Sequence, residues 1–344
     1  MSDRAQEDAH ISDPHFEKDK ALFAVFDGHG GREVAHFARN HFRDCVRSDP
    51  AYAKKDYKEG LRKAFLAIDD KLTKEGGLDE VAEMKRQNPP AKSPLMKILN
   101  DSMNKREGGP DGANPLGDDQ LQLDSIGCTS NVMMIDWERR KLVVANAGDS
   151  RCVMGAGGKC TPLSFDHKPE SQVEIDRIYK AGSTIVEGRV DGNLNLTRAL
   201  GDLKYKQNPD LAPEEHPITA NPDTYEYDMP ADLDFVLMGC DGVWEKKSNE
   251  EMVEYIYKQL GGQGYAADLK DIVADLLRKE CLSPDHQQTG KYSPAVTGCR
   301  RYRLRQYDVH SDCLWQEVSG QGRLRGVHAS TNLCVLTRGF WGFG

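Results

Sequence analysis

Apolar and polar positions follow two different periods along the chain, and each period predicts one kind of element. Six consecutive apolar residues at 21–26 have the length and β propensity of a fully buried strand. Shorter, mostly apolar stretches that also predict strands occur at 131–135, 141–145, 152–154 and 235–238. The charged turn at 136–140 joins two of these runs, which predicts a β-hairpin.

Apolar residues at spacings of three and four predict helices elsewhere. The predicted helices cover residues 32–46, 57–72, 172–181, 248–260 and 269–279. Gly182 follows the third of them in the C-cap position, and Ser248 with Glu251 forms a capping box at the start of the fourth. Strands in hairpin order with helices grouped between and after them are typical of an α+β layered sandwich.

Two stretches depart from these patterns. From 74 to 122 the periodicity disappears among Gly-Gly, Pro-Pro and Gly-Pro pairs, apart from one short candidate helix around 95–99. We interpret 74–122 as a mobile insertion, because it has too few apolar residues to fix itself on a core. Residues 290–344 carry eight Lys or Arg against three Asp or Glu, so this tail is compositionally distinct. The predicted catalytic domain is therefore 1–289, followed by an atypical basic tail.

Composition narrows the classes of function. The net charge of −9 over 344 residues argues against a nucleic-acid partner. The sequence has no apolar run long enough to span a membrane, so we expect no transmembrane segment. Nine scattered cysteines without a Cys-x-x-Cys pair indicate reduced thiols and a cytoplasmic or nuclear protein. We also expect the protein to be a monomer.

Acidic residues recur at the ends of the predicted strands. Asp27, Asp149 and Asp241 each follow an apolar run and lie next to a glycine, while Glu7 and Asp8 form an adjacent acidic pair. A single Asp-Gly pair is more typical of a solvated turn. Several carboxylates that converge at one edge of a sheet repel each other unless cations hold them, and an all-oxygen ligand set favours Mg²⁺ or Mn²⁺.

Seven short segments, in this order and spacing, resemble the metal-dependent protein phosphatase 2C family over roughly residues 5–289. They are Glu7-Asp8-Ala9-His10, Phe26-Asp27-Gly28-His29-Gly30-Gly31, Ser125-Ile126-Gly127-Cys128-Thr129-Ser130, Asn146-Ala147-Gly148-Asp149-Ser150-Arg151, Asp166-His167-Lys168-Pro169, Thr197-Arg198-Ala199-Leu200-Gly201-Asp202 and Cys240-Asp241-Gly242-Val243-Trp244. The resemblance implies a two-layer antiparallel β-sandwich flanked by helices. It also implies hydrolysis of phosphoserine and phosphothreonine in phosphorylated proteins by a metal-activated water.

The resemblance further implies a dinuclear Mg²⁺ or Mn²⁺ centre. Asp27 would bridge the two ions, the Gly28 carbonyl would bind one and Asp241 the other. Glu7 and Asp8 would bind directly or through water, and Asp149 matches a ligand of a third, weaker ion.

Residues outside the metal set complete the expected site. His29 would protonate the leaving oxygen as a general acid. Arg4 is the candidate phosphate ligand, although it stands one residue closer to the acidic pair than in the family. We interpret Arg198 and Asp202 as an internal ion pair and turn, the segment at 167–169 as a loop anchor, and Trp244 as a core residue.

The C-terminal end departs most from the family. A final core strand should open with a metal-binding aspartate, and its best counterpart, at 331–336, has Thr331 at the acid position. Asp312 is a weaker candidate for the missing ligand. The sequence therefore leaves two functions open: a working serine/threonine phosphatase, or a catalytically impaired binding or regulatory module with the same fold.

Overall fold

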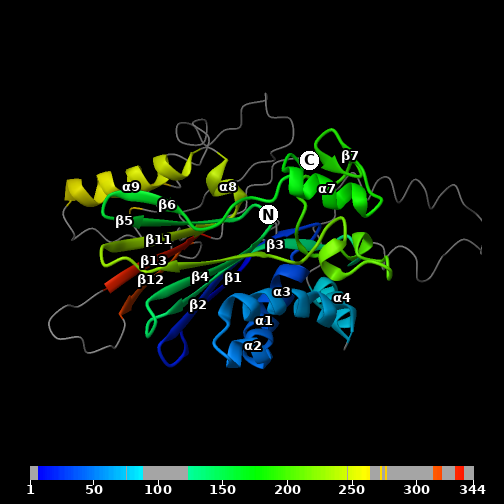
Figure 1. The fold of residues 1–344 in the computed structure, drawn as a ribbon, viewed down its shortest axis with the longest axis horizontal. Helices are drawn as coiled ribbons and strands as arrows, with labels where there is room; N and C mark the ends of the chain where they lie inside the picture. The colour runs from blue at the N-terminus through cyan, green and yellow to red at the C-terminus, as the bar shows by residue number, and fades with distance from the viewer. Residues whose placement is uncertain are drawn as a thin grey trace, which may run out of the picture.

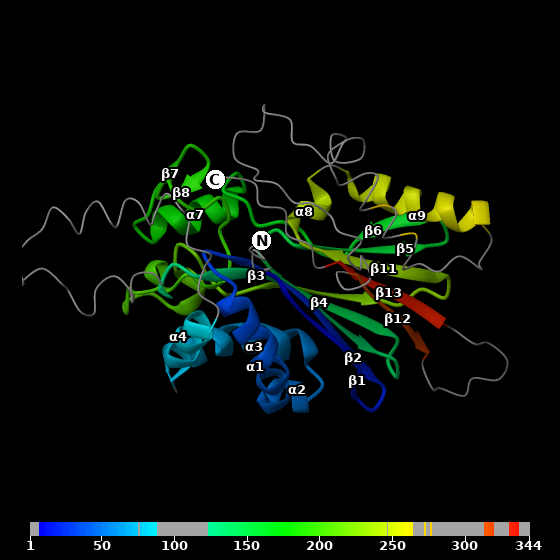
Figure 2. The same cartoon turned by 180° about the vertical axis from the view of Figure 1, so that it is seen from behind.

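The computed structural model describes residues 7–74, 76–87, 123–245, 247–263, 272 and 276, and the backbone of 313–319 and 330–336. In this part of the chain, two β-sheets lie face to face, and helices cover the outer face of each sheet (Figures 1 and 2). The predicted α+β sandwich is confirmed. The division into a domain at 1–289 and a tail stays a prediction.

The first sheet carries the predicted buried strand, β2, as an interior strand between β1 and β3. Its order is β1-β2-β3-β4-β10 with β9 beside β3, and every pair is antiparallel. The strands are β1 (Ala9–Glu17), β2 (Lys20–His29), β3 (Gly127–Asp136), β4 (Lys141–Ala147), β9 (Leu200–Gly201) and β10 (Asp223–Asp228). The predicted hairpin is β3–β4. Strand β2 continues past the apolar run as far as His29, so the Asp-Gly-His segment is paired strand and not a turn.

Both faces of β2 are buried, which explains its unbroken apolar run. Phe23 and Val25 pack into the core between the two sheets, while Leu22 and Phe26 pack into the core beneath the helices. All residues at 21–26 are fully buried. Since neighbouring side chains on a strand point to opposite faces, only a strand covered on both sides has this pattern.

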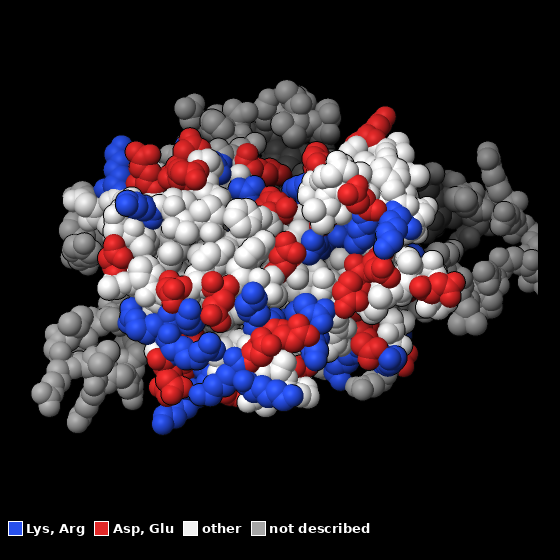
Figure 3. Space-filling view, in the orientation of Figure 1, with Lys and Arg blue, Asp and Glu red and all other residues white. Residues whose placement is uncertain are grey.

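The helical layer on the first sheet contains α1 (Glu33–Ser48), α2 (Pro50–Ala53), α3 (Tyr57–Thr73) and α4 (Gly77–Gln87). The helices predicted at 32–46 and 57–72 are confirmed as α1 and α3. On the outer surface, acidic and basic side chains are interspersed (Figure 3), and Arg62 pairs with Glu59 and Glu214 there. Such partly exposed pairs contribute little to stability.

Helix α4 corrects the expectation of an irregular segment over 74–122. Val81 of α4 is fully buried in the same core as α1 and α3, so Gly77–Gln87 is a packed part of the domain. One buried valine gave too weak a periodic signal to identify the helix. Residues 88–122, with the candidate helix at 95–99, lie outside the described residues.

The second sheet has the order β12-β13-β11-β5-β6. Its strands are β5 (Arg151–Ala156), β6 (Lys159–Pro162), β11 (Leu233–Gly239), β12 (Cys313–Ser319) and β13 (Ser330–Leu336), with α8 (Asp241–Trp244) and α9 (Asn249–Gln263) on its outer side. The capping box of α9 is confirmed: Ser248 N donates to Glu251 Oε2 at 2.8 Å and Glu251 N to Ser248 Oγ at 3.2 Å. Of the helix predicted at 269–279, the structure describes only two helical residues.

Strands β12 and β13 come from the basic tail, and β13 joins the sheet in a direction that corrects one prediction. It runs parallel to β11, with Asn332 beside Phe235 and Leu336 beside Gly239. Thr331, the second residue of β13, therefore lies at the end of β11 remote from Asp241, roughly 20 Å away at 3.3 Å per residue. The assignment of Thr331 to the acid position is wrong. Asp312 lies outside the described residues.

A small unit at one end of the sandwich contains α7 (Gln172–Lys180), β7 (Ile185–Val186) and β8 (Arg189–Val190) (Figure 1). Single-turn 3₁₀ helices at Leu203–Tyr205 and Pro213–Glu215 accompany it. Gly182 follows α7 with φ of +86°, as the predicted C-cap requires.

Arg198 joins this unit to the first sheet. Its guanidinium contacts Glu174 of α7 at 2.6 Å and Asp223 of β10 at 2.8 Å. The internal ion pair predicted for Arg198 thus exists, but its partners are Glu174 and Asp223. Asp202, which was expected to pair with Arg198, pairs with a different residue, His29.

Candidate active site

Acidic residues from four separate segments meet at one edge of the sandwich. Asp8 immediately precedes β1, Asp27 lies near the end of β2, Asp149 follows β4 and Asp241 follows β11. The fold places the ends of these strands together, so residues far apart in the sequence become electrostatic neighbours. This is the convergence predicted from the strand-end carboxylates.

The cluster is electrostatically unfavourable without cations. Burial, then the charges of Asp8, Asp241 and Asp149, raise the pKa of Asp27 well above its usual range. Burial, followed by the nearby charge of Asp149, raises the pKa of Asp241 to about 6. A carboxyl whose ionised form is destabilised in this way gains most from a positive ion beside it, so the cluster suits divalent cations.

Glu7 extends the cluster toward α1. Burial, then the charge of Glu33, raise the pKa of Glu7 to about 7, and its Oε2 atom is buried without a hydrogen-bond partner. The Glu7 backbone also crosses very close to β2. A Cβ on Gly28 would lie 2.4 Å from the Glu7 carbonyl oxygen, so only glycine permits this approach.

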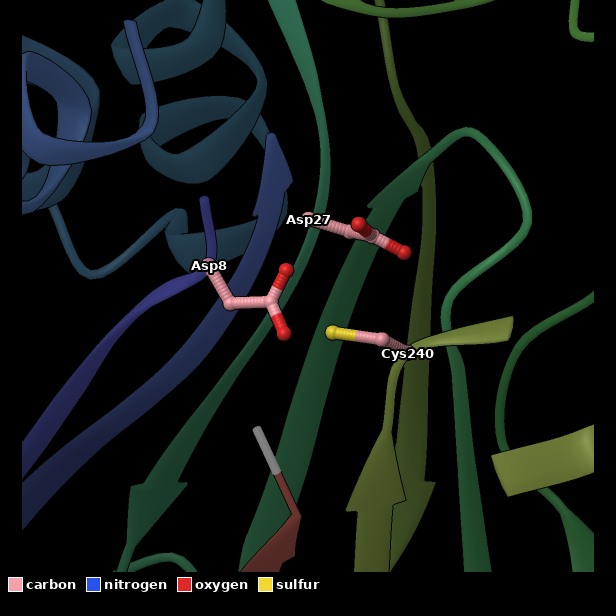
Figure 4. Close-up of side chains that lie close together, drawn as sticks. All are labelled: Asp8, Asp27 and Cys240. Atoms are coloured by element: carbon pink, nitrogen blue, oxygen red, sulfur yellow. The ribbon is translucent and has the colours of Figure 1, made fainter. Parts of the chain in front are cut away.

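Asp8, Asp27 and Cys240 form the tightest group of potential ligands among the described residues (Figure 4). One ligand atom from each lies within 4.8 Å of the others, which is a spacing that one metal ion can bridge. Cys240 is fully buried, and burial followed by the charges of Asp8 and Asp27 raises the pKa of its thiol well above the usual value. The donor set therefore fits a metal ion.

His29 is held by Asp202, which the sequence analysis interpreted as part of an internal ion pair and turn with Arg198. Its Nε2 atom lies 2.6 Å from Asp202 Oδ2; the His29 side chain is 24% exposed and that of Asp202 2% exposed. Burial lowers the pKa of His29, but the charge and the hydrogen bond of Asp202 offset this and leave the pKa raised. Gly127 provides the space, because a Cβ there would lie 2.3 Å from Asp202 Oδ2 and 2.6 Å from His29 Nε2.

Asp149 has a cationic partner within the chain. Lys168 Nζ donates a hydrogen bond to Asp149 Oδ2. Burial lowers the pKa of Lys168, yet the charge of Asp149 and this hydrogen bond outweigh burial, so the pKa is raised. His167 anchors the same loop, since its Nδ1 accepts a hydrogen bond from Gly148 N at 3.2 Å. The predicted loop anchor thus holds for His167, whereas Lys168 reaches the acidic cluster.

The structure brings together most of the predicted site residues: Glu7, Asp8, Asp27, Gly28, His29, Asp149 and Asp241. Arg4 lies outside the described residues. Trp244 is buried as predicted, with Nε1 donating to the Gly239 carbonyl at 2.9 Å. The sequence analysis missed the site contacts of Asp202, Lys168 and Cys240.

Comparisons with known proteins agree with this geometry. The model of the family "Protein phosphatase 2C" matches residues 2–90 and 76–290. Two solved structures from Toxoplasma gondii share the fold: a phosphatase (TM-score 0.55, 23% identity, 80% of this chain and 83% of that one) and a serine-threonine phosphatase 2C (TM-score 0.55, 17% identity, 80% and 86%).

Curated relatives match over most of their length. Probable protein phosphatase 2C 21 of Arabidopsis thaliana is 37% identical over 297 residues, which covers 81% of this chain and 78% of the relative. Probable protein phosphatase 2C 6 of Paramecium tetraurelia is 42% identical over 254 residues, covering 74% and 75%. The chain therefore belongs to the metal-dependent protein phosphatase 2C family and is, by this homology, a protein serine/threonine phosphatase.

Proposed function

We propose that the acidic cluster binds two Mg²⁺ or Mn²⁺ ions and that these residues carry the phosphatase reaction. Asp27 would hold both ions, Asp241 would bind one, and the Gly28 carbonyl with Asp8 and Glu7 would contribute to the other. The observation that carries the proposal is the convergence of at least partly buried carboxylates, whose pKa values are raised first by burial and then by the charges of neighbouring carboxylates. When bound, the ions supply Lewis-acid chemistry, polarising the phosphate and the attacking water.

The chain itself supplies the proton for the leaving group. His29 lies beside the cluster, partly exposed, so its imidazolium can donate to the serine or threonine oxygen of a phosphoprotein substrate. The buried carboxylate of Asp202 orients the ring and favours its protonated form. A raised pKa suits a general acid, because the acid must remain protonated near neutral pH.

Asp149 has a separate place in the proposal, as a ligand of a third and weaker ion. Its present partner is the Lys168 ammonium group. Lys168 balances the charge of Asp149 when no ion is bound there, and an ion at Asp149 must displace it. This competition accounts for weak binding at the third site.

The experiment that tests the metal roles measures hydrolysis of a phosphoserine peptide by the purified chain. Activity should appear with Mg²⁺ or Mn²⁺ and disappear in excess EDTA. Asp27→Asn and Asp241→Asn should lose turnover while keeping the far-ultraviolet circular dichroism spectrum of the unaltered chain. Full activity in EDTA, or full activity of both variants with Mn²⁺, would overturn the proposed centre.

Reduced catalysis is the second candidate function, favoured by the direction of β13. Because β13 runs parallel to β11, it cannot bring residue 331 to the end of the sheet where Asp241 lies. The described residues then offer Asp27 and Asp241 as the protein ligands of one ion. Metal dependence in the millimolar range with slow turnover would support an impaired enzyme, and tight binding with rapid turnover would exclude it.

A further inference from the structure

Cys240 occupies an unusual position for a buried thiol. It lies between the last residue of β11 and Asp241, and its sulfur points toward the carboxylates of Asp8 and Asp27 (Figure 4). A buried cysteine is ordinarily a small apolar side chain. Here the sulfur is close enough to two carboxylates for all three groups to share one ion.

The mixed donor set selects a different class of cation from the all-oxygen part of the cluster. Mg²⁺ and Mn²⁺ prefer oxygen ligands, whereas a thiolate favours Zn²⁺ and softer ions. Zn²⁺ takes four ligands, with bonds of about 2.3 Å to sulfur and about 2.0–2.2 Å to oxygen. One sulfur and two carboxylate oxygens therefore fill three of the four positions, and the divalent ion offsets two of their three negative charges.

We propose that Asp8, Asp27 and Cys240 form a binding site for a thiophilic divalent cation, Zn²⁺ or Cd²⁺, that excludes the ions needed for catalysis. Coordination deprotonates the thiol and releases its proton to solvent. The inference rests on the proposed function, because Asp8 and Asp27 are shared by the two kinds of ion. Occupation by the softer ion inhibits the phosphatase.

Cys240 differs from the other described cysteines in the potential metal ligands that lie near its sulfur. Cys45, Cys128, Cys152 and Cys160 likewise form no disulfide, but only Cys240 belongs to a group of three potential ligands within the described residues. Cys160 on β6 is partly buried and packs in the core under α9. It provides a matched control, because Cys160→Ser removes one thiol without touching the carboxylates.

The direct test is spectroscopic. The metal-free full-length chain is titrated with Co²⁺ or Cd²⁺, and the thiolate-to-metal charge-transfer absorption is recorded in the ultraviolet. The absorption should appear in the unaltered chain and in Cys160→Ser, and should be lost in Cys240→Ser. Its persistence in Cys240→Ser, or its absence from the unaltered chain, would overturn the proposal.

A second measurement needs no variant, in case Cys240→Ser does not fold. X-ray absorption at the zinc edge of the unaltered chain, loaded with one equivalent of Zn²⁺, should show sulfur at about 2.3 Å together with oxygen ligands. A shell of oxygen and nitrogen alone would contradict the assignment.

Inhibition links the site to activity. At fixed Mn²⁺, the Zn²⁺ concentration for half inhibition should rise by roughly tenfold or more in Cys240→Ser, as expected for loss of a metal ligand. Each variant is compared with its own activity without Zn²⁺. If Mn²⁺-dependent turnover is present but no thiolate absorption appears, only this inference fails. If Mn²⁺ is not required at all, the proposed function fails.

Discussion

The active site has an acid side, around His29, and a metal side, around Asp27 and Asp241. The two sides differ in whether the chain itself supplies the oppositely charged partner. On the acid side, His29 is already oriented by the buried Asp202, at 2.6 Å, and Gly127 leaves space for the pair. On the metal side, Asp27 and Asp241 have raised pKa values because their surroundings oppose their ionisation. One side is organised by a hydrogen bond between opposite charges, and the other side needs ions from solution.

This difference separates the effects expected from mutation. A residue on the metal side should change both ion binding and the stability that ions confer, since an ion that binds only the folded chain stabilises it. A residue on the acid side should change proton transfer and its pH dependence, without changing the affinity for ions. The predictions below use this contrast.

The largest effect is expected for Asp27→Asn. Turnover should fall to background, and Mn²⁺ should no longer raise the melting temperature. Without metal the variant should be at least as stable as the unaltered chain, because the amide replaces a carboxyl group whose ionisation is opposed by burial and by neighbouring acids. Thermal unfolding with and without Mn²⁺ measures the metal-free stability and the stabilisation by the ion. The control is Asp228→Asn, a substitution at an exposed position. A large loss of stability in the metal-free variant would refute the electrostatic account.

A smaller loss is expected for His29→Gln. Hydrolysis of a phosphoserine peptide should slow by roughly 10²–10⁴-fold, the usual contribution of general acid catalysis. Hydrolysis of p-nitrophenyl phosphate should slow less, because a phenolate leaves without much protonation. Mn²⁺ affinity should stay unchanged, and His41→Gln on α1 is the matched control. Equal losses on the two substrates would indicate a structural or metal-binding role.

Asp202→Asn should have a milder effect with a distinctive pH signature. Removing the carboxylate charge lowers the pKa of His29, so the imidazolium loses its proton at lower pH. The alkaline fall of kcat should therefore move to lower pH, and Asn tolerates the left-handed backbone at this position (φ of +50°). The pH profile of kcat measures the shift. If the alkaline fall of kcat occurs at the same pH in the variant, Asp202 does not act through His29.

The smallest effect is expected for Lys168→Met. Loss of the ammonium frees Asp149, so the weak additional ion should bind about tenfold more tightly, because the partly exposed Lys168 places this charge-assisted hydrogen bond at the low end of roughly 1.5–3 kcal/mol. Calorimetric titration with Mn²⁺ measures the change. Lys159→Met removes an exposed lysine from β6 as the control. Unchanged or weaker binding would contradict a competition between Lys168 and the ion.

The sequence predicted those features that depend on local pattern. Asp27 and Asp241 were identifiable because each ends an apolar run beside a glycine, and the strands did bring them together. Asp202 and Lys168 carry no such signal. Asp202 reaches His29 across 173 positions of sequence, and only the packing of β9 against β3 makes the contact possible.

Cys240 was missed for a different reason. In an apolar run a thiol is indistinguishable from a core residue, and only the position of Asp8, just before β1, shows what its sulfur faces. The parallel direction of β13 was equally out of reach, because strand direction depends on how the preceding chain returns to the sheet. Local sequence at 331–336 predicts a strand but not its direction.

The place of β13 has a consequence for the edges of the second sheet. With β13 beside it, β11 is an interior strand of the second sheet. A chain ending at 289 would leave one side of β11 without a neighbour, with an open row of backbone donors and acceptors next to an apolar strand. Such an edge is a template for pairing with another molecule. In the structure β13 fills this position, so the backbone groups on that side of β11 are paired within the chain.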